Sequence, residues 1–421
     1  MTHQEQSVIA AVDALSDYLV NLTSRLVRVP TVNPYSGDSS AGCERAGQEL
    51  MIQELRSAGA AVQRVNVPAD VYSRYGILGP ADRCWQDRFS VVGRFALGRG
   101  GKRLILNCHM DTVGVEDYEG DPFSGHVEDG KLFGRGSSDS KGNLAAGLAA
   151  IMALKASGVD IDGELIFESV VDEECNGAGA GTLACLAAGV VGDGCLALDG
   201  GAGSPYVGCY GVITPQITVR GRSGHAANGA VNAIDKLMIV KAAMDDLRCR
   251  RLALSERYQV NVGVIRGGSH PAIVPQRAWM QYNLVYSPEE AQGNGRPGGM
   301  LIRQVEQAIA DACAKDEWLR EHPPQIVWMK DAPPYRVDQS QQIIQIALGS
   351  YADVFGHPAQ PTMLAWGDAA HFWNIGGIPV AGMGSGSGST AHSSLEYIEL
   401  AQQLAGAKAI ALAAYRFLTR S

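Results

Sequence analysis

The sequence lacks the features of a membrane protein, a secreted protein and a nucleic-acid-binding protein. No apolar run approaches the roughly 20 residues that a bilayer-spanning helix needs. The first residues, Met-Thr-His-Gln-Glu-Gln, contain neither the basic nor the apolar segment of a signal peptide. The formal net charge of −9 argues against nucleic acid as the main partner. We therefore expect a small-molecule substrate, with no membrane and no nucleic-acid partner.

Closely spaced cysteine pairs are also missing. The nine cysteines include no Cys-x-x-Cys pair, and their odd number does not allow complete pairing. This pattern is typical of reduced, mostly buried thiols and predicts a cytoplasmic protein. Hydrophobic residues make up 46% of the 421 residues and charged residues 19%. A chain of this length is long for a single core, so two domains are expected.

Strands and helices alternate through the first half of the chain. Helical periodicity predicts amphipathic helices over 8–29 and 41–58. Alternating apolar strands and helices follow at about 61–67, 89–96, 103–108, 142–156, 163–171, 178–188 and 194–199. This rhythm predicts an α/β fold whose mainly parallel sheet is flanked by helices.

The pattern changes near Tyr210. Half-exposed strands of an antiparallel sheet and two helices are then expected at 216–220, 232–247, 258–266, 276–286, 299–314 and 325–330. Helices and strands alternate again at 338–352, 361–365, 367–374, 378–383 and 394–417. The sequence therefore predicts a catalytic domain made of 1–212 and 332–421, interrupted by a smaller α+β lid or dimerisation domain, 213–331.

Three polar clusters each follow an apolar segment or a glycine turn. They are His109-Met-Asp111, Gly134-Arg-Gly-Ser-Ser-Asp139-Ser-Lys-Gly142 and the pair Glu173-Glu174. Open α/β sheets keep their chemistry at such strand ends and loops. Histidine with several carboxylates, and no cysteine ligand, suits a hydrolytic Zn²⁺ or Mn²⁺ site better than a structural zinc site.

The chain resembles the acetylornithine deacetylase and succinyl-diaminopimelate desuccinylase family of zinc hydrolases in the order of these clusters, of Asp199 and of the later Ala391-His392. Relatives of that family include aminoacylases and glutamate carboxypeptidase. The resemblance extends from Leu26-Val-Arg-Val-Pro-Thr-Val-Asn-Pro34 to the C-terminal helix. It implies metal-dependent hydrolysis of an amide, with deacylation of an N-acyl amino acid or related amide as the first expectation. A dipeptidase or exopeptidase on the same scaffold stays open, as does a catalytically silent binding protein.

The resemblance implies a site for two divalent ions, with Zn²⁺ expected and Mn²⁺ or Co²⁺ as alternatives. His109 and Asp199 would bind one ion, and Glu174 and His392 the other. Asp139 would bridge the two ions, because a shared carboxylate offsets their repulsion. The resemblance also implies a cis peptide bond between Asp139 and Ser140.

The same resemblance assigns the catalytic roles. Glu173 would act as general base, taking a proton from the metal-bridging water that attacks the amide carbonyl. Asp111 would orient His109 from behind. Asp172 could compete with Glu173, although its position predicts a turn or capping role. His225, within Gly221-Arg-Ser-Gly-His-Ala-Ala227, would stabilise the oxyanion from the partner subunit of a homodimer formed by the inserted domain.

The inserted domain departs from the family pattern for binding a substrate carboxylate. Ala272 and Val285 stand where deacylases of the family carry asparagine and arginine. Valine does not replace a bidentate guanidinium. The substrate therefore either lacks that carboxylate or binds another cation, and the candidate cations are Arg266, Arg277 and Arg336.

Overall fold

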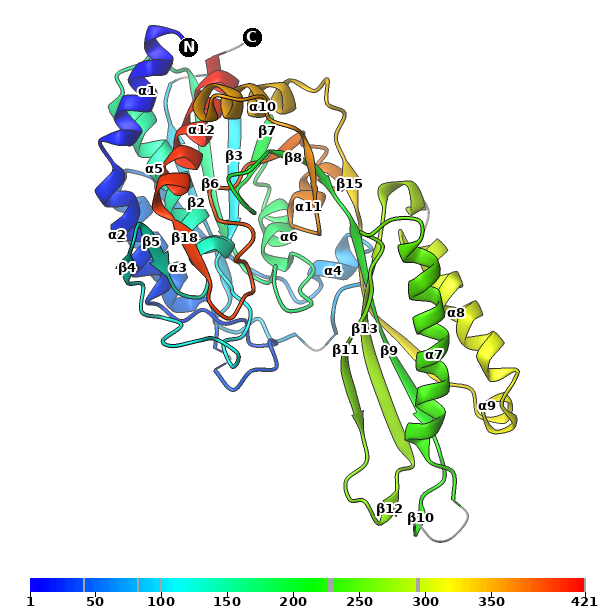
Figure 1. Ribbon diagram of the computed structural model, residues 1–421. Helices are drawn as coiled ribbons and strands as arrows, with labels where there is room; N and C mark the ends of the chain where they lie inside the picture. Colours follow the sequence, from blue (N-terminus) through cyan, green and yellow to red (C-terminus); the bar gives the residue numbers. More distant parts are fainter. Residues whose placement is uncertain (41, 82, 99, 226–229, 293–295, 420–421) are drawn as a thin grey trace. The chain divides into compact units, whose positions relative to one another are not determined.

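A computed structural model describes all residues except 41, 82, 99, 226–229, 293–295 and 420–421. The chain divides into two compact units, whose elements are labelled in Figure 1. The first unit comprises Met1–Tyr75, Arg83–Gly208 and Arg336–Ser421, and the second Gly76–Asp82 and Cys209–Tyr335. Assigning one unit to catalysis and the other to closure or dimerisation stays a prediction.

The first unit contains a nine-stranded sheet with the order β1-β2-β6-β3-β7-β17-β8-β15, and β16 pairs with β8. The neighbours β6, β3, β7 and β17 run parallel, whereas β1, β2 and β8 pair antiparallel. The predicted α/β fold with a mainly parallel sheet is confirmed. The strands are β1 (Ala61–Asn66), β2 (Phe89–Ala96), β3 (Lys102–His109), β6 (Gly163–Val170), β7 (Gly194–Ala197), β8 (Tyr206–Cys209), β15 (Tyr335–Arg336), β16 (Thr362–Leu364) and β17 (Val380–Gly382).

Helices cover both faces of this sheet (Figure 1). They are α1 (His3–Asp13), α2 (Ser16–Val27), α3 (Arg45–Ser57), α4 (Val71–Arg74), α5 (Gly142–Ala156), α6 (Ala180–Ala187), α10 (Gln342–Phe355), α11 (Ala369–Asn374) and α12 (Leu400–Thr419). A Cβ on Gly147 of α5 would lie 3.0 Å from Phe167 and 2.4 Å from Leu198, so glycine lets α5 approach the sheet closely. On the opposite face, Asn107 bonds Thr182 of α6. Alternate residues of a strand thus serve the two helical layers.

Two helices expected from the sequence differ in the first unit. The helix expected over 8–29 is two helices, because Leu15 leaves the helical conformation with φ −101° and ψ 10°. Hydrophobic spacing continues across that break and does not reveal it. The helix expected over 394–417 is preceded by β18 (Tyr397–Glu399), which pairs with β5 (Lys131–Phe133) beside β4 (Val127–Glu128). Ile398 is buried there with Leu132, so a short strand takes the place of the first helical turn.

The second unit has an antiparallel sheet with the order β11-β13-β9-β14, against which α7 and α8 pack (Figure 1). Strand β9 begins at Gly211, earlier than predicted, because Pro215 is tolerated where the pairing with β14 shifts register. The strands of this sheet are β9 (Gly211–Arg220), β11 (Val260–Gly267), β13 (Arg277–Tyr286) and β14 (Gln325–Ala332). The helices are α7 (Ala233–Leu252), α8 (Gly299–Cys313) and α9 (Glu317–Glu321). A separate short ribbon consists of β10 (Gly224–His225) and β12 (Ile273–Val274), which pair with each other.

Two further observations bear on the expectations from composition. All nine cysteines lie among the described residues and none of them forms a disulfide; five of them are buried. Within the described ranges, none of the helices has the length and apolar character needed to cross a bilayer.

Candidate metal centre

The site lies where the parallel strands end. His109 is the last residue of β3, and the register of β3 with β6 places it beside Val170. The segment Val171–Glu174 therefore continues from the same edge of the sheet. Strand β7 lies parallel to β3, and Asp199 follows it by two residues. Because parallel strands present their carboxyl ends together, three segments far apart in sequence converge at one edge.

Asp139 reaches this edge from η1 (Ser137–Lys141), the irregular turn that leads into α5. The peptide bond between Asp139 and Ser140 is cis, which confirms the expectation from the family resemblance. Asp139 and Ser140 both have non-helical φ and ψ values, and the regular helix α5 begins only at Gly142.

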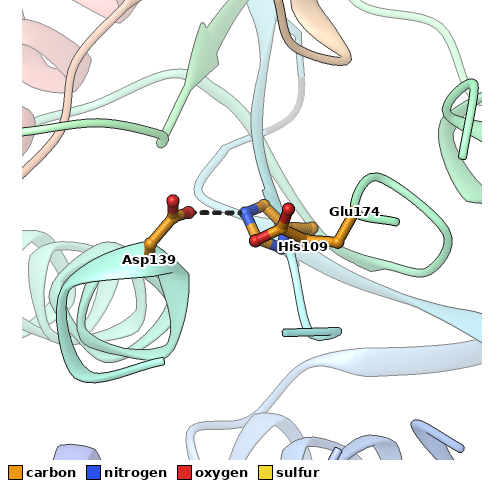
Figure 2. A group of neighbouring side chains, drawn as sticks. All are labelled: His109, Asp139 and Glu174. Carbon is orange, nitrogen blue, oxygen red and sulfur yellow. Dashed lines mark hydrogen bonds and ion pairs between the residues drawn. The ribbon is translucent and has the colours of Figure 1, made fainter. Parts of the chain in front are cut away.

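Four of the predicted ligands contact one another directly. His109 Nε2 lies 3.1 Å from Asp139 Oδ1 (Figure 2). His392 Nε2 lies 2.8 Å from Glu174 Oε1 and 3.3 Å from Asp139 Oδ2. Ligand atoms of His109, Asp139 and Glu174 all fall within 4.8 Å of one another. Atoms bound at about 2 Å to one zinc ion are about 3–4 Å apart, so the group fits a divalent cation after small adjustments.

Asp199, the remaining predicted ligand, is linked to Asp139 through Ser140. The Ser140 hydroxyl lies 3.2 Å from Asp139 Oδ1 and 3.3 Å from Asp199 Oδ1. Burial raises the pKa of Asp199 to about 6, and the nearby charge of Asp139 contributes to the shift. The two carboxylates therefore repel each other in a region with little solvent. A bound cation beside them would offset that repulsion.

The histidines respond to the same carboxylates. The charge of Glu174 raises the pKa of His392 to about 11, and hydrogen bonds to Asp139 and Glu174 add to this, although partial desolvation of the half-exposed ring opposes the shift. Burial opposes the charge on His109, but the bond to Asp139 and the charge of Glu173 raise its pKa well above the usual value. The negative potential that favours protons on these rings would equally favour a metal ion.

Glu173 lies beside this cluster. It borders a small buried pocket that is also lined by His109, Asp199 and Asp368. Burial raises the pKa of Glu173 well above its usual value, and the charges of Glu174 and Asp199 act in the same direction, whereas His109 opposes the shift. A carboxyl in such surroundings has the raised proton affinity that general base and acid catalysis requires.

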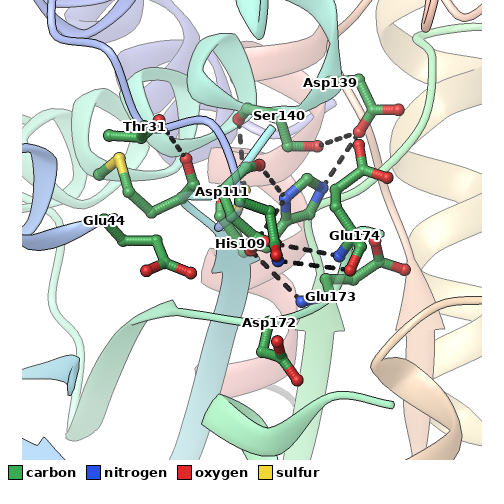
Figure 3. A network of polar contacts seen from close by, with 12 residues as sticks. Thr31, Glu44, His109, Asp111, Asp139, Ser140, Asp172, Glu173 and Glu174 are labelled. Atoms are coloured by element: carbon green, nitrogen blue, oxygen red, sulfur yellow. Dashed lines mark hydrogen bonds and ion pairs between the residues drawn. The ribbon is translucent and has the colours of Figure 1, made fainter. Parts of the chain in front are cut away.

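The contact between Asp111 and His109 is made by the backbone of Asp111. Its backbone oxygen lies 2.9 Å from His109 Nδ1, whereas its carboxylate oxygen Oδ1 is 3.9 Å away. The carboxylate instead accepts hydrogen bonds from the backbone N–H groups of Glu173 at 3.3 Å and Glu174 at 3.0 Å (Figure 3). The Asn33 side-chain amide donates to it at 2.8 Å. Asp111 thus fixes both the histidine and the turn that carries the two glutamates.

The alternative base, Asp172, is engaged elsewhere. Its carboxylate accepts a hydrogen bond of 2.6 Å from the Tyr72 hydroxyl and lies 3.1 Å from the guanidinium of Arg88. Its backbone has a φ of 68°. These contacts agree with the predicted turn role and leave Glu173 as the candidate base.

Sequence reasoning missed Glu396, whose buried carboxylate organises the loop before α5. Oε2 accepts hydrogen bonds from the Arg135 guanidinium at 2.9 Å and from Gly136 N–H at 3.1 Å. Oε1 accepts from the N–H groups of Ser138 at 2.9 Å and Asp139 at 3.0 Å. Because Glu396 follows His392 by four residues, its hydrogen bonds join the segment of His392 to the loop of Asp139. This short distance from a predicted ligand was the only feature of the sequence that pointed to Glu396.

Three other predicted residues lie on strands outside the segments that form this cluster. His225 lies in β10 and Arg277 in β13 of the second unit, and Arg336 is an exposed residue of β15. Ala226 and Ala227 of the predicted oxyanion segment lie outside the described residues. The roles of His225, Arg277 and Arg336 stay predictions.

A histidine–carboxylate cluster at the carboxyl edge of a parallel sheet, with a glutamate beside it, is typical of metal-dependent hydrolases. The family described as Peptidase family M20/M25/M40 matches residues 105–416. The chain belongs to this family, which confirms the resemblance recognised in its sequence motifs. Membership implies that the protein uses a divalent metal.

The relatives extend this conclusion to amide chemistry. The chain is 29% identical over 333 residues to the N-formyl-4-amino-5-aminomethyl-2-methylpyrimidine deformylase of Halalkalibacterium halodurans, covering 72% of this chain and 76% of the relative. It is 29% identical over 313 residues to the succinyl-diaminopimelate desuccinylase of Methylobacterium radiotolerans, covering 70% and 73%. The protein is therefore a metal-dependent hydrolase of amide bonds in small substrates.

Solved structures share the fold at low sequence identity. A di-peptidase from Saccharomyces cerevisiae matches with a TM-score of 0.80 and 16% identity, covering 100% of both chains. Human carnosine dipeptidase 1 matches with a TM-score of 0.75 and 16% identity, covering 99% of both. At this identity the similarity concerns the fold alone.

Replacing Glu396 by glutamine should weaken metal binding. Each carboxylate oxygen of Glu396 accepts hydrogen bonds from two N–H groups. In the glutamine variant, the side-chain NH₂ group would replace one of these oxygens and would face two N–H donors, whichever way the amide is turned. Residues that support metal ligands typically change affinity by about 10–100-fold, and we expect a loss of that size for Zn²⁺ in chelator competition. Glu399→Gln, three residues away, should bind Zn²⁺ like the unaltered protein. Equal affinities for both variants would contradict this role for Glu396.

Proposed function

We propose that the protein removes a small acyl group, with formyl as the first candidate, from the amine of a substrate that has no free carboxylate beside the amide. Two observations support this choice. Ala272 and Val285 occupy the positions expected to bind such a carboxylate. The deformylase of Halalkalibacterium halodurans is named for an N-formyl aminopyrimidine. If a carboxylate is present, Arg266, Arg277 and Arg336 remain the candidate cations.

We propose that the ligands are divided as the family resemblance implies. His109 and Asp199 would bind one ion, Glu174 and His392 the other, and Asp139 both. The contacts of Asp139 with both histidines, and its link to Asp199 through Ser140, support the bridging position. Zn²⁺ is the proposed metal, because nitrogen and carboxylate ligands without cysteine suit it in catalytic sites. The cysteines, which form no disulfide among the described residues, support the proposal of a reducing compartment such as the cytoplasm.

The proposed mechanism gives the proton transfers to Glu173. The metals would supply Lewis acidity to the carbonyl and acidify the attacking water. Glu173 takes the proton of that water and returns it to the leaving amine, which a carboxyl with a raised pKa can do in both directions. The turn bonded by Asp111 holds Glu173 one residue from the ligand Glu174. Base and ligand are thus positioned by one turn.

Replacing Glu173 by glutamine should abolish turnover. The amide does not accept the proton of the water, and general base catalysis contributes about 10²–10⁴-fold to a rate. We expect kcat to fall by at least that factor while metal content, measured by atomic absorption, stays near that of the unaltered protein. Glu128→Gln, at an exposed position, serves as the matched control. Retention of more than a few per cent of kcat would show that another group is the base.

A substrate panel should separate the deacylase from the dipeptidase alternative, which Asp199 favours because aspartate at this position is commoner in the peptidases of the resembled family. We expect the highest kcat/KM for N-formyl aryl-methylamines, lower values for N-acyl amino acids, and the lowest for dipeptides. Glu173→Gln serves as the blank for each substrate. A preference for dipeptides would instead support the exopeptidase reading on the same site.

We further propose that the second unit forms a homodimer and provides His225 to the partner's site as oxyanion donor. His225 lies on the short β10–β12 ribbon, which supports a role outside the core of that unit. His225→Ala should lower kcat while the metals are retained, because a missing oxyanion donor costs about 10²–10³-fold.

Mixed dimers provide the test of this arrangement. In a dimer of one His225→Ala subunit and one Glu173→Gln subunit, one site combines an intact Glu173 with the partner's intact histidine. Activity should therefore return on mixing. A fully active monomer, or mixed dimers without activity despite demonstrated subunit exchange, would rule out the contribution in trans.

A further inference from the structure

The turn that carries Glu173 and Glu174 has an unusual backbone. Asp172, Cys175 and Asn176 have φ values of 68°, 55° and 60°, in the left-handed region that favours glycine. Three such residues within five positions persist only where neighbouring groups hold them. The position of the base and its adjacent ligand therefore depends on the contacts made to this turn from outside.

Several groups hold the beginning of the turn. The carboxylate of Asp172 is bound by the Tyr72 hydroxyl and by Arg88, which also pairs with the buried Glu44. The backbone oxygen of Asp172 accepts a hydrogen bond of 3.2 Å from Gly179 N–H. This end would stay in place if a single contact were lost.

One guanidinium spans both ends of the turn. Nη2 of Arg83 donates a hydrogen bond of 2.9 Å to the backbone oxygen of Cys175, and Nη1 lies 3.4 Å from Asp172 Oδ1. Nη1 is also 3.5 Å from the side-chain oxygen of Asn33, whose amide binds Asp111. Arg83 therefore joins the two ends of the turn to the group that fixes its middle.

Arg83 is itself held rigidly. Its guanidinium carbon lies 3.9 Å from the centre of the Tyr35 ring, and only 4% of its side chain is exposed. The Tyr35 hydroxyl accepts a hydrogen bond from the backbone N–H of Cys84, next to Arg83. Lysine keeps the charge but lacks the planar fork that reaches two acceptors while stacking on a ring.

From these contacts we infer that Arg83 is a positioning residue for the reaction: it clamps the Asp172–Asn176 turn and so places the carboxylate of Glu173. The inference rests on the proposed function, in which Glu173 is the base. Arg83 acts through the turn and through Asn33, without a step of its own in the chemistry.

The test compares Arg83→Ala and Arg83→Lys with Arg74→Ala, which removes an exposed arginine paired with Asp70. Steady-state kinetics are measured at saturating Zn²⁺, and Zn²⁺ affinity by chelator competition. Because small displacements of a reacting group cost about 10²-fold, we expect kcat of Arg83→Ala to fall about 10–100-fold with little change in KM. Arg83→Lys should recover only part of this loss. Arg74→Ala should match the unaltered protein.

Added guanidinium distinguishes positioning from a general loss of structure. Millimolar guanidinium should raise kcat of Arg83→Ala in a saturable manner, because it can occupy the place between Tyr35 and the Cys175 carbonyl. It should leave Glu173→Gln inactive, and sodium chloride at equal ionic strength should have no effect. If Arg83→Ala does not fold, Arg83→Lys and Tyr35→Leu carry the same comparison of kcat.

Three outcomes would overturn the inference. They are an unchanged kcat in Arg83→Ala, a loss of activity that is seen only below saturating Zn²⁺, and a loss that only follows a lower melting temperature without recovery by guanidinium. Each leaves the proposed function standing if the unaltered protein hydrolyses amides and Glu173→Gln does not. An active Glu173→Gln variant would instead contradict the proposed function itself.

Discussion

Repulsion between buried carboxylates is the constraint around which the first unit is organised. Asp139, Glu174 and Asp199 converge with Glu173 at the edge of the sheet, and burial with mutual repulsion raises the pKa of Asp199 and of Glu173. Such a group is stable only with positive charge among its members. The raised pKa values of the two histidines favour protons on their rings, and the same geometry suits a divalent ion. Metal binding and the integrity of this edge are therefore linked.

The surrounding contacts keep that charge in a defined geometry. Glu396 holds the loop of Asp139 through four hydrogen bonds, and Asp111 holds the turn of Glu173 and Glu174 through two. Arg88 and Arg83 neutralise the carboxylates behind the turn. The loop of Asp139 and the turn of Glu174 are thereby each fixed by a charged residue from another segment. This explains why residues that never reach the substrate are expected to change metal affinity or turnover.

The sequence allowed much of the fold to be predicted, because its signals are local. Apolar runs ending in polar residues indicated β3, β6 and β7, and the change to alternating strands near Tyr210 indicated a second sheet. Errors occurred where local signals mislead. The break between α1 and α2 at Leu15 interrupts a continuous hydrophobic pattern. The first half of β9 was not predicted, because it contains Pro215. Ile398 lies in a strand too short to recognise from sequence.

The sequence by itself determined the residue types of the candidate site and their order, since metal chemistry demands histidine and carboxylates at strand ends. It also determined the absence of the expected arginine and asparagine at Val285 and Ala272. Only the tertiary structure decided which groups support them. Glu396, Arg83 and Asn33 act through contacts over separations of 50 to 261 residues. Such long-range hydrogen bonds follow from how the strands and loops pack, which no local pattern encodes.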